Sequence, residues 1–249
     1  RAEKRNQIAS VMPAVAVGDV NNDAMPDILV PPYPLPSSYA AARLLLNGGK
    51  GRFTTEKEDS LGGLHELAAA STGATLVDLN LDGRVDLLIG TQSRGLRLYL
   101  GTRSNRFVDA TLSFVPQVAQ NGEVRNVSVV DIDKDGRPDI FVNFYHQPNV
   151  LLRNRFPHPV DKGVLAVRLR GKKGIINSRL ELLDAQERRI AADQILGSHG
   201  NGAQNPLRAR FVLDPGGYTL AVRYSDGARE KHAVDVPGGK VTWVTITRK

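Results

Sequence analysis

The sequence predicts an all-β fold, with three β-propeller-type blades followed by a small β-sandwich. A stretch rich in aspartate, written DIDKDGRPDI at residues 131–140, has two further copies earlier in the chain. Each copy lies between short runs of apolar and β-branched residues, which favour strands over helices. The last third of the chain has no such copy and alternates apolar and polar residues between glycine-containing turns. Together these observations predict short strands throughout.

The repeated unit is longer than the aspartate-rich stretch alone. DVNNDAMPDILV, DLNLDGRVDLLI and DIDKDGRPDIFV begin at Asp19, Asp78 and Asp131 and align without gaps. The copies are spaced 59 and 53 residues apart. A further strand-like run follows each copy and closes on a phenylalanine (Phe53, Phe107 and Phe156). Periods near 50 residues with several short strands per unit are typical of propeller blades or a related β array.

The alternate polar residues have the spacing of a metal-binding loop. Carboxylates crowded into one turn repel each other, and a hard divalent cation removes that cost. Ca²⁺ takes oxygen ligands from carboxylates, amides and backbone carbonyls. We therefore expect up to three Ca²⁺ sites, with side-chain oxygens from positions 1, 3, 5 and 9 of each loop and a backbone carbonyl from position 7. The expected ligands are Asp19, Asn21, Asp23, Met25 and Asp27; Asp78, Asn80, Asp82, Arg84 and Asp86; and Asp131, Asp133, Asp135, Arg137 and Asp139.

The loops differ at position 6, where the backbone must turn sharply. Gly83 and Gly136 supply this turn in the second and third loops, whereas the first loop has Ala24. A left-handed backbone at alanine costs about 1–2 kcal/mol. We therefore expect the first site to be the weakest and the third, with four carboxylates, to be the tightest. Solvated aspartate-rich turns without metal are the alternative, which three aligned copies disfavour, and the ligand count favours Ca²⁺ over another hard cation.

This pattern resembles the FG-GAP, or VCBS, repeats, which are the calcium-binding blades of integrin-type β-propellers. The resemblance covers about residues 13–156 and implies calcium in the loops. Ala24 departs from the glycine of the family pattern. Three repeats are also fewer than the 4–8 blades of most propellers. Blades upstream of Arg1, closure by oligomerisation and an open array are the alternatives.

The last third of the chain forms a second predicted unit. We expect a calcium-binding repeat region at residues 1–157, a linker at 158–162 and a β-sandwich at 163–249. The sandwich segment resembles the ASPIC/UnbV domain, which follows VCBS repeats in secreted proteins of the cartilage acidic protein family. The matching stretches are LAVRLRGKKGIINSRLEL, GSHGNGAQ and VRYSDGAREKHAV. This resemblance implies architecture and location more than chemistry.

Charge and composition limit the classes of partner. The net charge of +7 lies in residues 163–249, which contain 15 Lys and Arg against 8 Asp and Glu. A basic solvated surface is the simpler interpretation, and a docking face for an acidic partner is the alternative. We expect no nucleic-acid partner, because the basic residues are scattered and no aromatic residues interleave them. We expect no membrane span, because no apolar run reaches about 18 residues.

No catalytic residue and no organic cofactor site are predicted. Cysteine is absent, which excludes disulfides and cysteine nucleophiles. The histidines lack the spacing of metal ligands, and the glycine-rich stretch around His199 lacks the lysine of a phosphate loop. The chain begins with Arg1 and shows no signal peptide, so we expect a processed or truncated N-terminus.

The expected function is therefore calcium-stabilised binding, adhesion or assembly. We expect an extracellular, cell-surface or periplasmic location, because millimolar calcium outside the cell fills even weak sites. The expected partners are proteins, glycans or copies of the same chain in an oligomer or filament. The alternative is a carbohydrate-active enzyme or lectin on a propeller scaffold, since a fold alone does not decide function.

Overall fold

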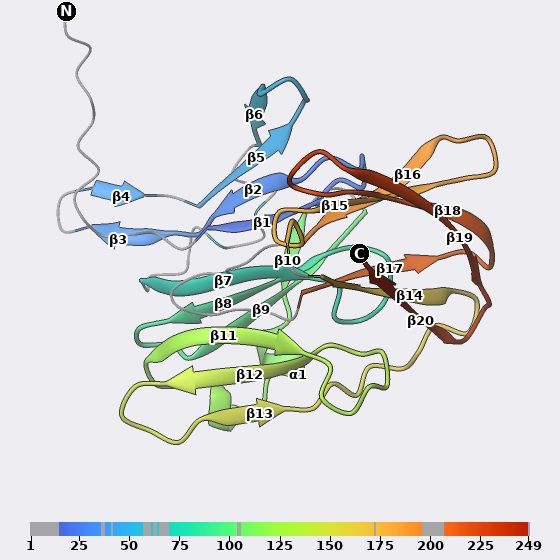
Figure 1. Ribbon diagram of the computed structural model, residues 1–249. Coiled ribbons are helices and arrows are strands. Elements are labelled where there is room, and N and C mark those ends of the chain that lie inside the picture. The colour runs from blue at the N-terminus through green and yellow to red at the C-terminus, as the bar shows by residue number, and fades with distance from the viewer. Residues whose placement is uncertain are drawn as a thin grey trace, which may run out of the picture.

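The structure is a computed structural model in which almost all regular elements are strands (Figure 1). The described residues also include a four-residue helix, α1 (Thr111–Phe114), and a short 3-10 turn, η3 (Gln117–Ala119). The predicted all-β class is confirmed. His65 and the glycine-rich stretch around His199 lie outside the described residues. The described ranges are 15–35, 38–40, 42–56, 61, 64, 70–103, 106–171, 173–195 and 207–248.

Each aspartate-rich loop joins the first two strands of an antiparallel sheet, as the repeat predicts. Position 9 of each loop is the first residue of the second strand, so the loop ends where the strand pairing begins. The strands of the first sheet, in order, are β1 (Ala16–Gly18), β2 (Asp27–Val30), β5 (Arg43–Asn47) and β6 (Phe53–Thr55). Those of the second are β7 (Ser71–Val77), β8 (Asp86–Thr91), β9 (Leu96–Gly101) and β10 (Phe107–Asp109). Those of the third are β11 (Val124–Val130), β12 (Asp139–Phe144) and β13 (Val150–Leu152).

A separate two-stranded hairpin follows the first loop and its second strand. It consists of β3 (Tyr33–Leu35) and β4 (Ser38–Ala40), which pair with each other outside the three larger sheets. The hairpin therefore lies within the first repeat as an insertion between β2 and β5.

The three sheets pack face to face as adjacent blades of a β-propeller. Strand β1 packs against β7, and β7 packs against β11, so the first strands of the three blades are neighbours. Strand β8 supplies Leu87 and Ile89 to the core between the first and second blades. It supplies Leu88 to the core between the second and third blades. All six residues of β8 are buried, as expected for a strand that is covered on both faces.

The C-terminal part is a β-sandwich, as predicted. One sheet has the order β17 (Arg208–Leu213), β14 (Gly163–Arg170) and β20 (Val241–Thr247). The other has the order β16 (Arg189–Gln194), β15 (Arg179–Leu183), β18 (Gly216–Arg223) and β19 (Arg229–Val236). Leu165, Leu180 and Leu220, all fully buried, belong to the core that the two sheets share. The segment between β13 and β14, which contains the predicted linker, has no strand.

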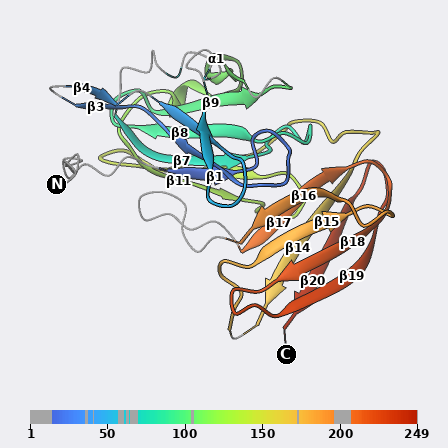
Figure 2. The same cartoon turned by 90° about the horizontal axis from the view of Figure 1, so that it is seen from above.

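The sandwich lies at one end of the blades (Figure 2). This is the end at which the three aspartate-rich loops lie, because residues of all three loops and of β16 and β17 line one cavity. The fold therefore places the predicted metal loops at the boundary between the repeats and the sandwich.

Candidate metal centre

The three loops share one backbone conformation. Position 6 is left-handed in all of them, including the first loop, where Ala24 has a φ of 61°. The strained alanine that the sequence predicts is therefore present. Position 4 is also left-handed, which sequence reasoning missed because no glycine marks it. The φ values at position 4 are 57° at Asn22, 57° at Leu81 and 62° at Lys134.

The amide at position 6 holds the first aspartate of each loop. Ala24 N donates to Asp19 Oδ2 at 2.7 Å. The corresponding bond from Gly83 to Asp78 Oδ2 measures 2.9 Å. The bond from Gly136 to Asp131 Oδ2 measures 3.1 Å. The left-handed turn at position 6 thus aims the amide back at the start of the loop, and the first carboxylate is turned inward.

Positions 3 and 5 are held in the same way by amides two residues further on. The amide of position 5 donates to the side chain of position 3, and the amide of position 7 donates to that of position 5. These are Asx-turns, in which an Asp or Asn oxygen accepts from the backbone two residues later. The bonds at position 3 are Asp23 to Asn21 (3.1 Å), Asp82 to Asn80 (3.1 Å) and Asp135 to Asp133 (3.4 Å). Those at position 5 are Met25 to Asp23 (2.8 Å), Arg84 to Asp82 (2.9 Å) and Arg137 to Asp135 (2.9 Å).

The aspartate at position 9 has a structural role that sequence reasoning missed. Asp139, which is 1% exposed, accepts from Ile132 N at 3.0 Å and from Asn154 N at 2.8 Å. It therefore ties the loop to the segment that follows the third strand of its blade. The same pair of bonds recurs in the other blades, to Asp86 from Leu79 N and Gly101 N, and to Asp27 from Val20 N and Asn47 N. A signal in the sequence is the shared spacing of 15 residues from Asp86 to Gly101 and from Asp139 to Asn154.

The third loop brings three carboxylates together. Asp131, Asp133 and Asp139 each offer an oxygen, and these oxygens lie within 4.8 Å of one another. Among the described residues, only this group of acidic or histidine side chains converges so closely. Asp131 Oδ1 is buried and has no hydrogen-bond partner. Since an unpartnered buried carboxylate oxygen is costly, this oxygen fits a cation ligand.

Arginine side chains neutralise part of the acidic charge, which sequence reasoning also missed. Arg84 pairs with Asp82 in the second loop, and Arg137 pairs with Asp135 in the third. Sequence reasoning assigned these arginines only a backbone carbonyl, although the basic residue two positions after the aspartate was a visible signal. Burial is the largest influence on Asp135 and raises its pKa, but the hydrogen bonds from the side chain and amide of Arg137 and the charges of Arg137 and His158 together lower it below the usual range. Asp135 thus lies outside the converging group.

Burial shifts the pKa of five other loop carboxylates in the opposite direction. It raises the pKa of Asp19 to about 6 and the pKa of Asp78 and Asp86 each to about 7. Burial also raises the pKa values of Asp27 and Asp131. The ionised forms of these groups are therefore costly in the protein alone, and at Asp131 the charge of Arg210 offsets this cost only in part. A bound cation would offset the cost, and an all-oxygen donor set suits a hard ion such as Ca²⁺.

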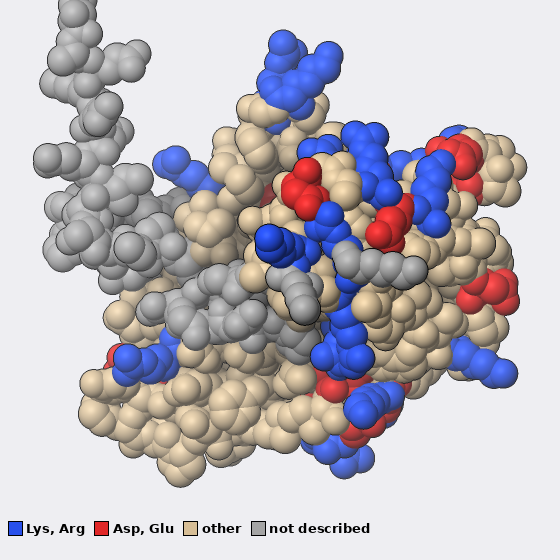
Figure 3. All heavy atoms as spheres, in the orientation of Figure 1, with Lys and Arg blue, Asp and Glu red and all other residues tan. Residues whose placement is uncertain are grey.

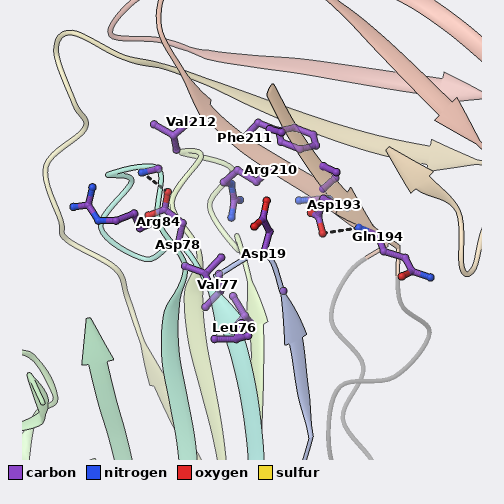
Figure 4. A pocket seen from close by; sticks show the side chains of 18 of the residues that line it. Asp19, Leu76, Val77, Asp78, Arg84, Asp193, Gln194, Arg210, Phe211 and Val212 are labelled. Carbon is purple, nitrogen blue, oxygen red and sulfur yellow. Dashed lines mark hydrogen bonds between the residues drawn. The ribbon is translucent and has the colours of Figure 1, made fainter. Parts of the chain in front are cut away.

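The loops open onto a shared cavity of about 220 Å³, which the first aspartates of all three loops help to line. Arg210 of β17 points into this space beside Asp19 and Asp78 (Figure 4). Its Nη2 lies 3.5 Å from Asp131 Oδ2. Asp193 of β16 also faces the cavity, and burial raises its pKa to about 6. The sandwich thus contributes both a cation and a carboxyl group next to the loops.

Comparison with models of protein families shows which family the repeats match. The model of the FG-GAP-like repeat matches residues 19–89 and 78–142. Both matches start at the first aspartate of a loop. Residues 19–142 are FG-GAP-like repeats. The resemblance inferred from the loop pattern is therefore confirmed for this part of the chain.

Comparison with individual proteins gives more distant similarities. The chain is 30% identical over 133 residues to cartilage acidic protein 1 of Xenopus tropicalis, a match that covers 52% of this chain and 19% of that protein. This chain thus spans about a fifth of that relative. This match agrees with the predicted similarity to the cartilage acidic protein family.

Two solved structures also align with the chain. PorZ, described as a bacterial surface component of the type-IX secretion system of Porphyromonas gingivalis, aligns with a TM-score of 0.33 and 13% identity, over 91% of this chain and 30% of PorZ. The Bacillus anthracis TIE protein aligns with a TM-score of 0.28 and 9% identity, over 90% of this chain and 59% of that one. Both TM-scores are below 0.5, so the fold assignment rests on the repeats and the sheet topology.

Proposed function

We propose that this protein is a calcium-stabilised, non-catalytic binding or assembly protein. It acts outside the cell, at the cell surface or in the periplasm, through contacts with proteins or glycans. The observation that carries the proposal is the third loop, where three carboxylates converge and Asp131 Oδ1 has no partner in the protein. The shared loop conformation extends the proposal to the first and second loops as weaker sites.

Each loop would hold the ion through its inward-facing oxygens. In the third loop these belong to Asp131, Asp133 and Asp139, with the carbonyl of Arg137 as a further ligand. Bound Ca²⁺ would neutralise the crowded carboxylates and hold together the first two strands of each blade. Any agent that binds the folded state alone raises its stability, by about 2.7 kcal/mol at a ligand concentration 100 times Kd. Calcium would therefore stabilise the blades.

The proposed location rests on the similarity to a known protein. The proposed partners rest on apolar side chains that are exposed at the surface. The similarity to cartilage acidic protein 1 favours a site outside the cell, where calcium is abundant. Within the described ranges, no helix is long and apolar enough to span a membrane. Leu112, Phe114 and Val118 expose apolar side chains within seven residues of each other, at 83%, 51% and 62% exposure. Exposed apolar groups in one place are typical of protein contact surfaces.

The surface charge gives weaker support for an acidic partner. On the face in Figure 3, basic and acidic side chains lie next to each other rather than forming a field of one sign. Several basic residues of the sandwich are paired, among them Arg188 with Asp184 and Lys231 with Glu187. The proposed contacts therefore use apolar and polar groups more than net charge.

Thermal unfolding of a metal-free sample tests the calcium part of the proposal. We expect the midpoint to rise steeply with added Ca²⁺ and much less with equal Mg²⁺, because Mg²⁺ demands a smaller octahedral site and dehydrates reluctantly. Solution mass in both conditions reports assembly. An unchanged midpoint in Ca²⁺ and in chelator would remove the proposed function.

A further inference from the structure

The sandwich contacts position 6 of each metal loop. Nη2 of Arg179, in β15, donates to the carbonyl oxygen of Ala24 at 2.8 Å. A Cβ built on Gly83 would lie 3.8 Å from the carbonyl oxygen of Val212, in β17. Three different strands of the sandwich make such contacts, the third being β20. The sandwich is therefore docked on the turn of every loop.

The contact at the third loop is the closest. A Cβ built on Gly136 would lie 2.3 Å from Cγ2 of Val241, the first residue of β20. The valine side chain thus rests directly on the α-carbon of the glycine. Because Gly136 has a φ of 89°, a conformation that side chains other than glycine rarely adopt, no other residue would permit both this turn and this contact.

Position 6 is also the residue that holds the first expected metal ligand. Its amide donates to Oδ2 of that aspartate in all three loops. In the third loop, Oδ1 of the same aspartate is the buried oxygen without a partner. A metal ion at Oδ1 and the sandwich at position 6 therefore favour the same loop conformation from two sides.

We propose that docking of the sandwich and binding of divalent cations to the loops are coupled, so that each strengthens the other. The inference rests on the proposed calcium sites and adds a regulatory link between the two parts of the chain. Because coupling is reciprocal, calcium tightens the boundary between repeats and sandwich, and loss of calcium loosens it. Typical couplings change affinity by about 5–150-fold.

Two substitutions on the sandwich side test this without altering any loop residue. Val241→Ala removes the contact with Gly136, and Arg179→Met removes the bond to Ala24. The matched controls are Val244→Ala, a half-buried valine of the same strand that packs on the sandwich core, and Arg189→Met, which shares the ion pair with Glu181. Fluorescence of Trp243, the single tryptophan, checks that each variant is folded.

The readout is an NMR titration of the full chain with CaCl₂, following the amide signals of Ala24, Gly83 and Gly136. Each amide bonds to the first aspartate of its own loop, so each reports one site. We expect Val241→Ala to weaken binding at Gly136 by about fivefold or more and to leave Gly83 unchanged. We expect Arg179→Met to weaken binding at Ala24 only. Both controls should match the wild type.

The outcomes separate this inference from the calcium proposal. If the wild type binds Ca²⁺ and both variants bind it equally well, the coupling is overturned and the calcium sites stand. If the wild-type amides do not respond to Ca²⁺, both are overturned. A control that weakens binding as much as its variant also overturns the coupling, because the effect then belongs to general destabilisation of the sandwich.

Discussion

Gly136 and Asp131 form the link on which the third loop depends. The glycine amide donates to one carboxylate oxygen at 3.1 Å, and the other oxygen of the same carboxylate is buried without a partner. One half of the side chain is thus fixed by the backbone, and the other half is left for a ligand. Asp133 and Asp139 each bring a carboxylate oxygen to within 4.8 Å of an oxygen of Asp131.

Substitutions at Asp133 and Asp139 should distinguish an effect on Ca²⁺ affinity from an effect on the stability of the metal-free chain. Asp133 is exposed and its ion pair with Arg153 lies at the surface, so Asp133→Asn should cost the metal-free chain no more than about 1 kcal/mol of stability. It should weaken Ca²⁺ binding at the third loop by about tenfold or more, because affinity depends on the number of charged ligands. Calorimetric titration and thermal unfolding in chelator measure the two effects.

Asp139→Asn should instead destabilise the chain even without metal. Asp139 accepts two backbone amides, and an asparagine has only one oxygen to offer them. The cost of one unsatisfied buried amide is about 1–3 kcal/mol. Urea unfolding in chelator measures it. Equal stability of the two variants in chelator would contradict the structural role of position 9.

Gly136→Ala should cost more free energy of unfolding than Gly83→Ala. Both glycines have positive φ, at 89° and 84°, so each substitution carries the left-handed strain of about 1–2 kcal/mol. The new methyl group at Gly136 would collide with Val241, whereas the one at Gly83 would meet no atom closer than 3.8 Å. The double variant Gly136→Ala with Val241→Ala should recover part of the loss. Equal costs for the two glycines in urea unfolding would show that the sandwich does not press on the third loop.

Asn154→Ala should destabilise the chain more than Asn47→Ala. The Asn154 side chain donates to Pro138 O at 3.0 Å and to Leu79 O, in the neighbouring blade, at 2.8 Å. Within the described part of the chain, the Asn47 side chain donates only the first kind of bond, to Pro26 O at 3.0 Å. One additional hydrogen bond is worth about 1 kcal/mol. Urea unfolding of the two variants measures the contribution of the hydrogen bond from Asn154 to Leu79. A larger loss of unfolding free energy for Asn47→Ala would contradict that contribution.

Stability of the metal-free chain should fall as the pH rises from about 5 to 8. Burial raises the pKa of Asp78 and Asp86 to about 7, so the folded state holds protons that the unfolded state has released. That stabilisation is complete below the ordinary value of 3.8 and is lost as pH passes through 7. Urea unfolding in chelator at pH 5 and pH 8 measures it. Asp78→Asn should reduce the slope, and a metal-free chain that is more stable at pH 8 would contradict the shifts.

The strands and the three loops could be predicted because their signals are local. Alternation, β-branched runs and the aspartate spacing of each loop lie within a few neighbouring residues, and the loop motif is then repeated 59 and 53 residues further on. The left-handed position 4 could not be predicted, because Leu81 and Lys134 carry no sign of it. The contacts between the sandwich and the loops join residues that are distant in the sequence, such as Arg179 and Ala24, which are 155 positions apart. Such contacts depend on how the sandwich docks, which no local pattern encodes.

Titration calorimetry of the metal-free chain with Ca²⁺ tests the central claim most directly. We expect saturable binding with a Kd no weaker than about 10⁻³ M, as in extracellular calcium modules. The tightest component should weaken by about tenfold or more in Asp133→Asn and stay unchanged in Asp184→Asn, an aspartate of the sandwich far from the loops in sequence. No binding by the wild type up to about ten times that concentration, or an unchanged tightest site in Asp133→Asn, would contradict a calcium centre in the third loop.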